Sequence, residues 1–145
     1  PINTHSCSDA SRRGRRIVAN FEIVEFHIPR FAKMKKNADV DYVEYYVRYG
    51  PESGNLWLRF MFGGLVGGEK PRQLPDSSIK WTERAWSCEQ SANGTDWIGV
   101  GPDGRKWRHI AIPFGFAAYE SMPPKADHYF DKILDTMCCG KWPHN

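Results

Sequence analysis

The sequence contains no long apolar run. Its 145 residues have a mean hydropathy of −0.59, and the apolar stretch from Leu56 to Leu58 is interrupted at Arg59. A helix that crosses a bilayer needs about 20 mainly apolar residues, so we expect no transmembrane segment. Repeats, low-complexity tracts and a second-domain boundary are also lacking. A hydrophobic content of 41% with a charged content of 26% excludes a disordered composition, and the length suffices for one domain with a proper core.

Familiar catalytic motifs are lacking as well. The sequence has no G-x-S-x-G nucleophile elbow and no C-x-x-C pair. The histidines that could act as acid–base groups, His27, His109 and His128, fall in three different predicted elements. We therefore favour a non-catalytic protein over an enzyme, and we expect no cofactor. The alternative is a small hydrolase or a ligand-binding pocket closed by the loop 63–68, with His109 as its titrating group.

Four cysteines are the most informative feature that is present: Cys7, Cys88, Cys138 and Cys139. A disulfide between the adjacent Cys138 and Cys139 would need a strained ring, so we predict that Cys7 and Cys88 each bond to one member of this pair, in either combination. Disulfides persist in oxidising compartments, and we therefore expect a secreted or periplasmic protein; no signal peptide is visible at the start of the sequence. Zinc or copper binding by these thiols is disfavoured, because adjacent cysteines fit a tetrahedral site poorly, and we expect no metal.

Positive charge is concentrated near the start of the chain. The net charge is +3, but the first 36 residues include eight basic residues and only three acidic ones. Residues 1–16 form a predicted basic arm, and residues 17–145 form a predicted single α+β domain. The arm could bind a polyanion through Arg12, Arg13, Arg15 and Arg16. Nucleic acid is not the favoured ligand, because no aromatic side chains stand among these arginines.

Alternating apolar residues predict a series of β-strands. The six predicted strands are 17–28, 40–49, 56–62, 79–88, 97–100 and 106–112. In the first of them, a slip of the apolar phase between Ile23 and Val24 predicts a β-bulge or a strand that is buried on both faces. The next two flank a Gly/Pro turn and predict an antiparallel hairpin, and a second turn is predicted at 101–104. Residues 31–39 are interpreted as a basic connector.

Helical spacing replaces alternation at the end of the chain. The segment from Pro124 to Cys139 predicts one helix whose apolar stripe consists of Phe130, Ile133, Leu134 and Met137. The stripe must be buried, most economically on a sheet. We therefore predict an α+β domain in which an antiparallel β-meander sheet of about six strands carries one C-terminal amphipathic helix; the alternative is a β-sandwich closed by the helix. The opposite side of the helix repeats Asp127, Asp131 and Asp135 and is predicted to face solvent.

Aromatic and basic residues share the polar faces of two predicted strands. Tyr42, Tyr46 and Arg48 alternate on one face of their strand, and Trp57 and Arg59 alternate on one face of the next. Tyrosine, tryptophan and arginine are enriched at the energetic centres of protein interfaces. The leading hypothesis is therefore an exported, non-catalytic binding module or an accessory subunit of a larger complex. Its partner would be another protein or an anionic surface.

Overall fold

The computed structural model describes residues 15–19, 24–30, 32–48, 58–63, 78–87, 93–112 and 115–139. The described chain forms ten strands and one helix, in the order β1 (Arg15–Ala19), β2 (Val24–Ile28), β3 (Lys33–Ala38), β4 (Tyr42–Arg48), β5 (Leu58–Gly63), β6 (Lys80–Ser87), β7 (Asn93–Val100), β8 (Lys106–Ile112), β9 (Gly115–Met122), α1 (Asp127–Leu134) and β10 (Cys138–Cys139).

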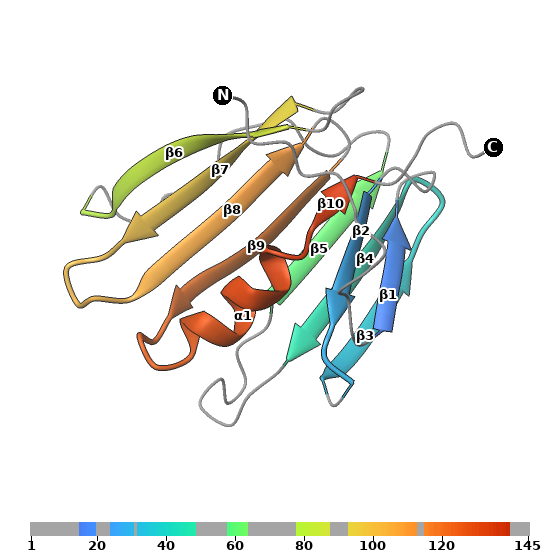
Figure 1. Cartoon of the computed structure of the whole chain (residues 1–145), viewed down its shortest axis with the longest axis horizontal. Coiled ribbons are helices and arrows are strands. Elements are labelled where there is room, and N and C mark those ends of the chain that lie inside the picture. Colours follow the sequence, from blue (N-terminus) through green and yellow to red (C-terminus); the bar gives the residue numbers. More distant parts are fainter. Residues whose placement is uncertain are drawn as a thin grey trace.

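Seven of these strands form one antiparallel sheet in the order β3-β4-β5-β9-β8-β7-β6. The order joins two meanders, β3–β5 and β6–β9, through the pairing of β5 with β9. A small sheet of β1, β2 and β10 lies with α1 on one face of the large sheet (Figure 1). The predicted α+β class, with a mostly antiparallel sheet and a C-terminal helix, is therefore confirmed. The strand order differs from a single meander, because β9, the last strand of the second meander, pairs with β5 in the middle of the sheet.

The hydrophobic core lies between the large sheet and this covering layer. Phe26 of β2 stacks on Phe60 of β5 with ring centroids 3.7 Å apart, and it makes a T-shaped contact with Tyr45 at a centroid distance of 6.0 Å. The apolar stripe of the helix is buried as predicted, since Phe130, Ile133, Leu134 and Met137 are all almost fully inaccessible to solvent. These contacts fix which face of the large sheet is covered.

The first part of the chain folds differently from the prediction. Residues 17–28 were expected to form one strand, but the described residues of this span belong to two antiparallel strands, β1 and β2, in which Ile17 stands opposite Phe26. The predicted phase slip lies where β2 begins, at Val24, and Ile23 is outside the described residues. The predicted connector 31–39 contains β3, because lysines are tolerated on an edge strand whose side chains reach solvent. Val40, expected in a strand, lies outside β4 in the connection from β3 and is 95% exposed.

The helix is also shorter than the predicted span from Pro124 to Cys139. It ends at Leu134, and Cys138 and Cys139 pair with β2 as the strand β10. Thr136 fixes this exit, because its hydroxyl accepts a hydrogen bond from the amide of His27 at 2.9 Å and lies 2.6 Å from the carbonyl oxygen of Ile133. Long-range pairing with β2 thus replaces the last predicted turn of the helix.

Two local features shape the β7–β8–β9 region. The predicted turn at 101–104 joins β7 to β8, and Gly104 has φ = 81°, a conformation that glycine adopts without steric cost. In β9, three residue steps from Tyr119 to Met122 stand opposite two steps in β8, so β9 is bulged there. Ser121 has φ = 47° at this bulge, and its carbonyl oxygen accepts a hydrogen bond from Arg105.

Candidate functional site

One face of the large sheet is covered by no helix or strand within the described ranges, and we call it the open face. Residues directly opposite each other on neighbouring strands point to the same side, so the register defines its composition. One row crosses all seven strands and consists of Lys35, Tyr46, Arg59, Ala118, His109, Trp97 and Glu83. A basic end, an aromatic middle and an acidic end therefore share one surface.

Arg59 is the centre of the aromatic part. Its guanidinium lies 6.0 Å from the ring centroid of Tyr46 and 5.3 Å from that of Phe116, within the range of cation–π attraction. Glu44 holds it in place, because Oε2 of Glu44 accepts a hydrogen bond from Nε at 2.7 Å and lies 2.6 Å from Nη2. The arginine side chain is nevertheless 42% exposed. A preoriented guanidinium between two rings is thus presented to solvent.

We call Arg59, Tyr46 and Phe116 the platform. His109 extends the platform, and among the described residues it has no acid–base partner. Its ring stacks on that of Phe116, with centroids 4.9 Å apart and planes 19° apart. Burial lowers the pKa of His109 to about 4, so the imidazole is neutral at pH 7. Within the described part of the chain, no hydrogen bond or ion pair engages its ring. The imidazole is therefore a flat neutral ring, and no group among the described residues orients it for proton transfer.

Tyr46 stands at the border of the aromatic and basic parts. Burial raises the pKa of its phenol, the nearby Glu44 raises it further, and Arg59 opposes them. The phenol is therefore uncharged across the physiological range. Tyr46 and Arg59 were both predicted as binding residues, and the structure brings them directly opposite each other. The predicted Tyr42 and Arg48 lie on the same face of β4.

The remaining predicted sites lie partly outside the described residues. Trp57, Arg12 and Arg13 are outside them, as are Cys7 and Cys88. Arg15 and Arg16 were expected in a free arm, but their backbone begins β1 and pairs with Ile28 and His27.

The cysteine prediction is tested only at one sulfur. Cys138 is disulfide-bonded, and its partner is not among the described side chains. The pairing scheme therefore stays a prediction. The sulfur of Cys138 lies 3.9 Å from Oε1 of Glu25, and the same oxygen lies 3.4 Å from Nε2 of His27.

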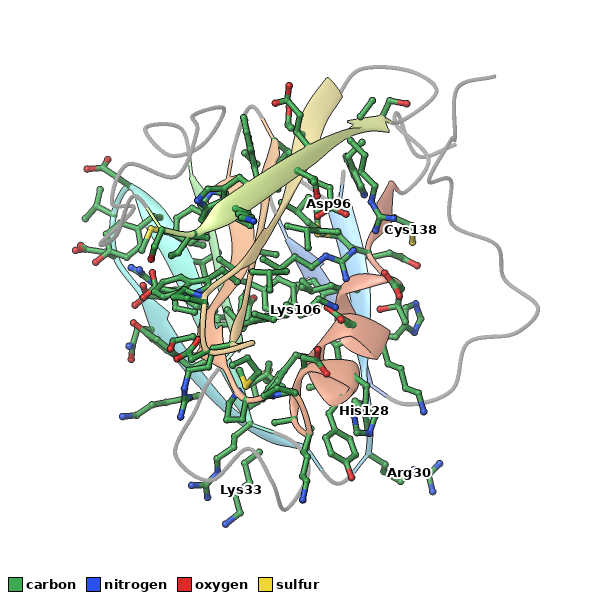
Figure 2. All side chains as sticks on the ribbon, turned by 90° about the vertical axis from the view of Figure 1, so that its left-hand side faces the viewer. Arg30, Lys33, Asp96, Lys106, His128 and Cys138 are labelled. Atoms are coloured by element: carbon green, nitrogen blue, oxygen red, sulfur yellow. The ribbon has the colours of Figure 1, made fainter. Side chains whose placement is uncertain are left out.

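A second polar cluster lies on the covered side, between the large sheet and α1. Arg108 is only 4% exposed and makes a bidentate contact with Asp96, through bonds of 3.1 and 2.9 Å. It also donates to Asp131 and Asp135, each at 3.0 Å. Figure 2 shows Asp96 and Lys106 on the helix side of the sheet, and Lys106 donates to Asp131 at 3.0 Å.

The prediction of a solvated aspartate face on the helix is therefore wrong for Asp127 and Asp131, whereas the Asp135 side chain is 61% exposed. Asp127 and Asp131 face the cations of β8, and Asp131 also accepts a 2.8 Å hydrogen bond from Tyr119. Burial lowers the pKa of Arg108, but the bonds and charges of Asp96 and Asp131 outweigh it, so the net shift is upward. For Tyr119, burial and the charge of Asp131 both raise the pKa. The cluster is a closed ionic clamp that fastens α1 to the sheet.

Two kinds of site are not found in the part of the chain that the structure describes. No group of three or more histidine, cysteine, aspartate or glutamate side chains is arranged to hold a metal ion. No helix there has the length and apolar character needed to cross a membrane. The open face and the ionic clamp are thus the two clusters from which a function can be argued.

Sequence reasoning missed three members of the open-face site: Phe116, His109 as a stacking group, and Lys35. Phe116 stands in β9, which was not predicted because glycine and alanine dilute its alternation. Lys35 was assigned to a connector. Glu44 alternates with Tyr42 and Tyr46 along β4, but its bond to Arg59 depends on the pairing of β4 with β5.

Comparisons with protein-family models, with curated proteins and with solved structures found no match for this chain. The functional argument therefore rests on the geometry of the open face.

Proposed function

We propose that this chain is an exported, non-catalytic binding module or accessory subunit, and that its open face binds another protein. The observation that carries the proposal is the position of Arg59, which Glu44 holds beside Tyr46 and Phe116 while its side chain stays 42% exposed. Interface hot spots are enriched in tyrosine, tryptophan and arginine and depend on preorganised side chains. The open face has both features, because it presents Tyr46 and Arg59 and because Glu44 holds Arg59 in place.

The electrostatics of the platform favour binding over catalysis. A general base is most effective when its pKa lies near the working pH, but burial lowers the pKa of His109 to about 4. Its neighbour on the platform is the ring of Phe116, which can neither orient nor accept a proton. The alternative of a His109-dependent hydrolase therefore has less support than recognition through flat, neutral and cationic groups.

The guanidinium of Arg59 also indicates what the partner must offer. Glu44 engages its Nε and Nη2 side, and the exposed remainder of this planar group is a donor that suits an oxygen acceptor. A partner carbonyl or carboxylate beside an apolar side chain would bind this donor and cover the two rings. Export is supported by the disulfide at Cys138.

Site-specific photo-crosslinking tests this function and identifies the partner in the same experiment. Benzoylphenylalanine would replace Met61, which is opposite Phe116 on the open face, in protein produced by the native organism. The matched control places it at Lys132, an exposed position on α1. We expect a discrete cross-linked protein from position 61 and none from position 132. No adduct at 61, or the same adduct from both positions, would contradict the proposal.

A further inference from the structure

The outer edge of β3 is one of the two edges of the large sheet. β3 is the last strand in the sheet order, and among the described residues no strand pairs with its outer side. Five of its six residues are exposed, Met34 being the exception. An edge strand of this kind offers a row of peptide groups to another extended chain.

The phase of the β3–β4 hydrogen bonds shows which groups point outward. The amide of Asp39 donates to the carbonyl of Tyr42 at 2.9 Å, next to the first ladder pair. Residues of an antiparallel pair alternate between bonding to the partner strand and pointing away from it. Lys33, Lys35 and Asn37 therefore bond to β4, and the peptide groups of Met34, Lys36 and Ala38 point to the outer edge.

The side chains of this edge are strongly basic. Within the described residues, no carboxylate lies within ion-pair distance of Lys33, Lys35 or Lys36. Lys33 and Lys35 belong to the open face, whereas Lys36 lies on the other side, with its ammonium 5.7 Å from the ring centroid of Tyr45. Figure 2 shows Lys33 at the margin of the molecule, pointing away from it. Three lysines within four residues thus have no countercharge among the described residues.

We propose that β3 binds an extended acidic segment of the partner protein, which adds to the large sheet as a further strand. Peptide groups of the segment pair with the outward groups of β3, and its carboxylates pair with the lysines. A second copy of this chain fits less well, because two β3 edges would bring lysine against lysine. The inference rests on the proposed protein-binding function and adds to it the chemistry and the binding mode of the partner.

The position of other charges restricts where the acidic side chains lie. Asp39 and Asp41 follow β3 in the connection to β4, and both are exposed. Acidic residues of the added strand must therefore stand opposite residues 33–36, away from these aspartates. Lysines on an edge strand also protect a protein from aggregation. If this were their only role, the edge would not bind an acidic peptide through ordered backbone hydrogen bonds.

The test uses two synthetic probes on the intact chain at low ionic strength. One is a short acetylated peptide of alternating glutamate and threonine, and the other has lysine in place of glutamate. Amide hydrogen exchange is followed by NMR. With the acidic peptide at about ten times its Kd, exchange at Met34, Lys36 and Ala38 should slow about tenfold, and exchange at Lys35 and Asn37 should change little. The basic peptide should have no effect.

Two variants separate strand addition from simple charge attraction. Lys36→Pro removes one outward amide without removing a bond to β4, and Lys36→Gln is its control of equal charge. Lys36→Pro should bind the acidic peptide at least about tenfold more weakly than Lys36→Gln. The double variant Lys33→Glu with Lys35→Glu should no longer bind the acidic peptide and should instead bind the basic peptide. Unchanged exchange at Asn37 shows that each variant keeps the β3–β4 ladder. The proposal is overturned if the acidic peptide does not bind, if it binds without protecting the three outward amides, or if Lys36→Pro binds it normally.

The outcome is distinguishable from that of the proposed function. If the cross-linked partner binds Lys36→Pro normally but not Arg59→Ala, the open face stands and strand addition fails. If the partner binds Arg59→Ala normally but not Lys36→Pro, the edge of β3 is the binding site and the platform is not.

Discussion

The ionic clamp under α1 allows a test of how burial affects the contribution of an ion pair to the free energy of unfolding. Two arginines meet the same oxygen, Oδ2 of Asp96, at the same distance of 2.9 Å. The side chain of Arg84 is 60% exposed, whereas that of Arg108 is 5% exposed. The acceptor oxygen and the distance are therefore the same, but Arg108 is buried and also bonds to Oδ1 of Asp96, to Asp131 and to Asp135.

Arg108→Met should lower the free energy of unfolding by about 3–5 kcal/mol, the usual cost of removing one partner from a buried pair. The Asp96 side chain is only 3% exposed, so water cannot replace the lost cation. Arg84→Met should cost about 0–1 kcal/mol, as for an exposed pair. Domains of this size are stable by about 5–15 kcal/mol, so the difference is readily measured.

Urea denaturation followed by tryptophan fluorescence measures both variants against the parent chain, which has six tryptophans. An additional Asp96→Asn substitution in the Arg108→Met background should recover part of the loss, because a buried amide costs less than a buried carboxylate whose remaining cation, Arg84, is largely exposed. If Arg108→Met and Arg84→Met differ by less than about 0.5 kcal/mol, within the error of additivity, the clamp does not fasten α1 as described.

Three further expectations concern the core, a histidine and the cysteines. Leu134→Ala should cost about 2–5 kcal/mol in urea denaturation, because Leu134 is 1% exposed; a change within noise would mean that the stripe is not packed. Burial lowers the pKa of His109 from 6.5 to about 4, so the unfolded chain binds more protons between these values. The free energy of unfolding should therefore fall as pH drops through this window, by up to about 3 kcal/mol. His109→Phe should flatten the pH dependence, and an unchanged slope would refute this assignment. The native chain should weigh four hydrogens less than the reduced chain in mass spectrometry, because two disulfides are predicted; four thiols open to alkylation would contradict this.

Local patterns sufficed where the physical cause is local. The alternation of β4 correctly placed Tyr42 and Tyr46 on one face of the strand and Tyr45 and Val47 on the other face, because successive side chains of a strand point to opposite sides. The apolar stripe of α1 was equally predictable, since three- and four-residue spacing places its members on one side. Turn chemistry identified the connection at 101–104 through Gly104.

Features that depend on distant partners could not be predicted in this way. The helix ends early because β10 pairs with β2, more than a hundred residues away in sequence. The aspartates of α1 look like a solvated face until β8 supplies Arg108 and Lys106. The same holds at the candidate site, where Phe116 reaches Arg59 only because β9 pairs with β5.

The central claim is that Arg59 and Tyr46 are the energetic centre of a protein-binding face. The most direct measurement is the Kd for the purified partner identified by cross-linking, determined by isothermal titration calorimetry. Arg59→Ala and Tyr46→Ala should each weaken binding about 30-fold or more, which corresponds to about 2 kcal/mol or more. Arg105→Ala, which removes an arginine side chain of similar exposure, 44%, from the connection between β7 and β8, should leave the Kd unchanged. Equal affinities for the parent chain and both platform variants would contradict the claim, as would a turnover that is lost in His109→Ala and retained in the platform variants.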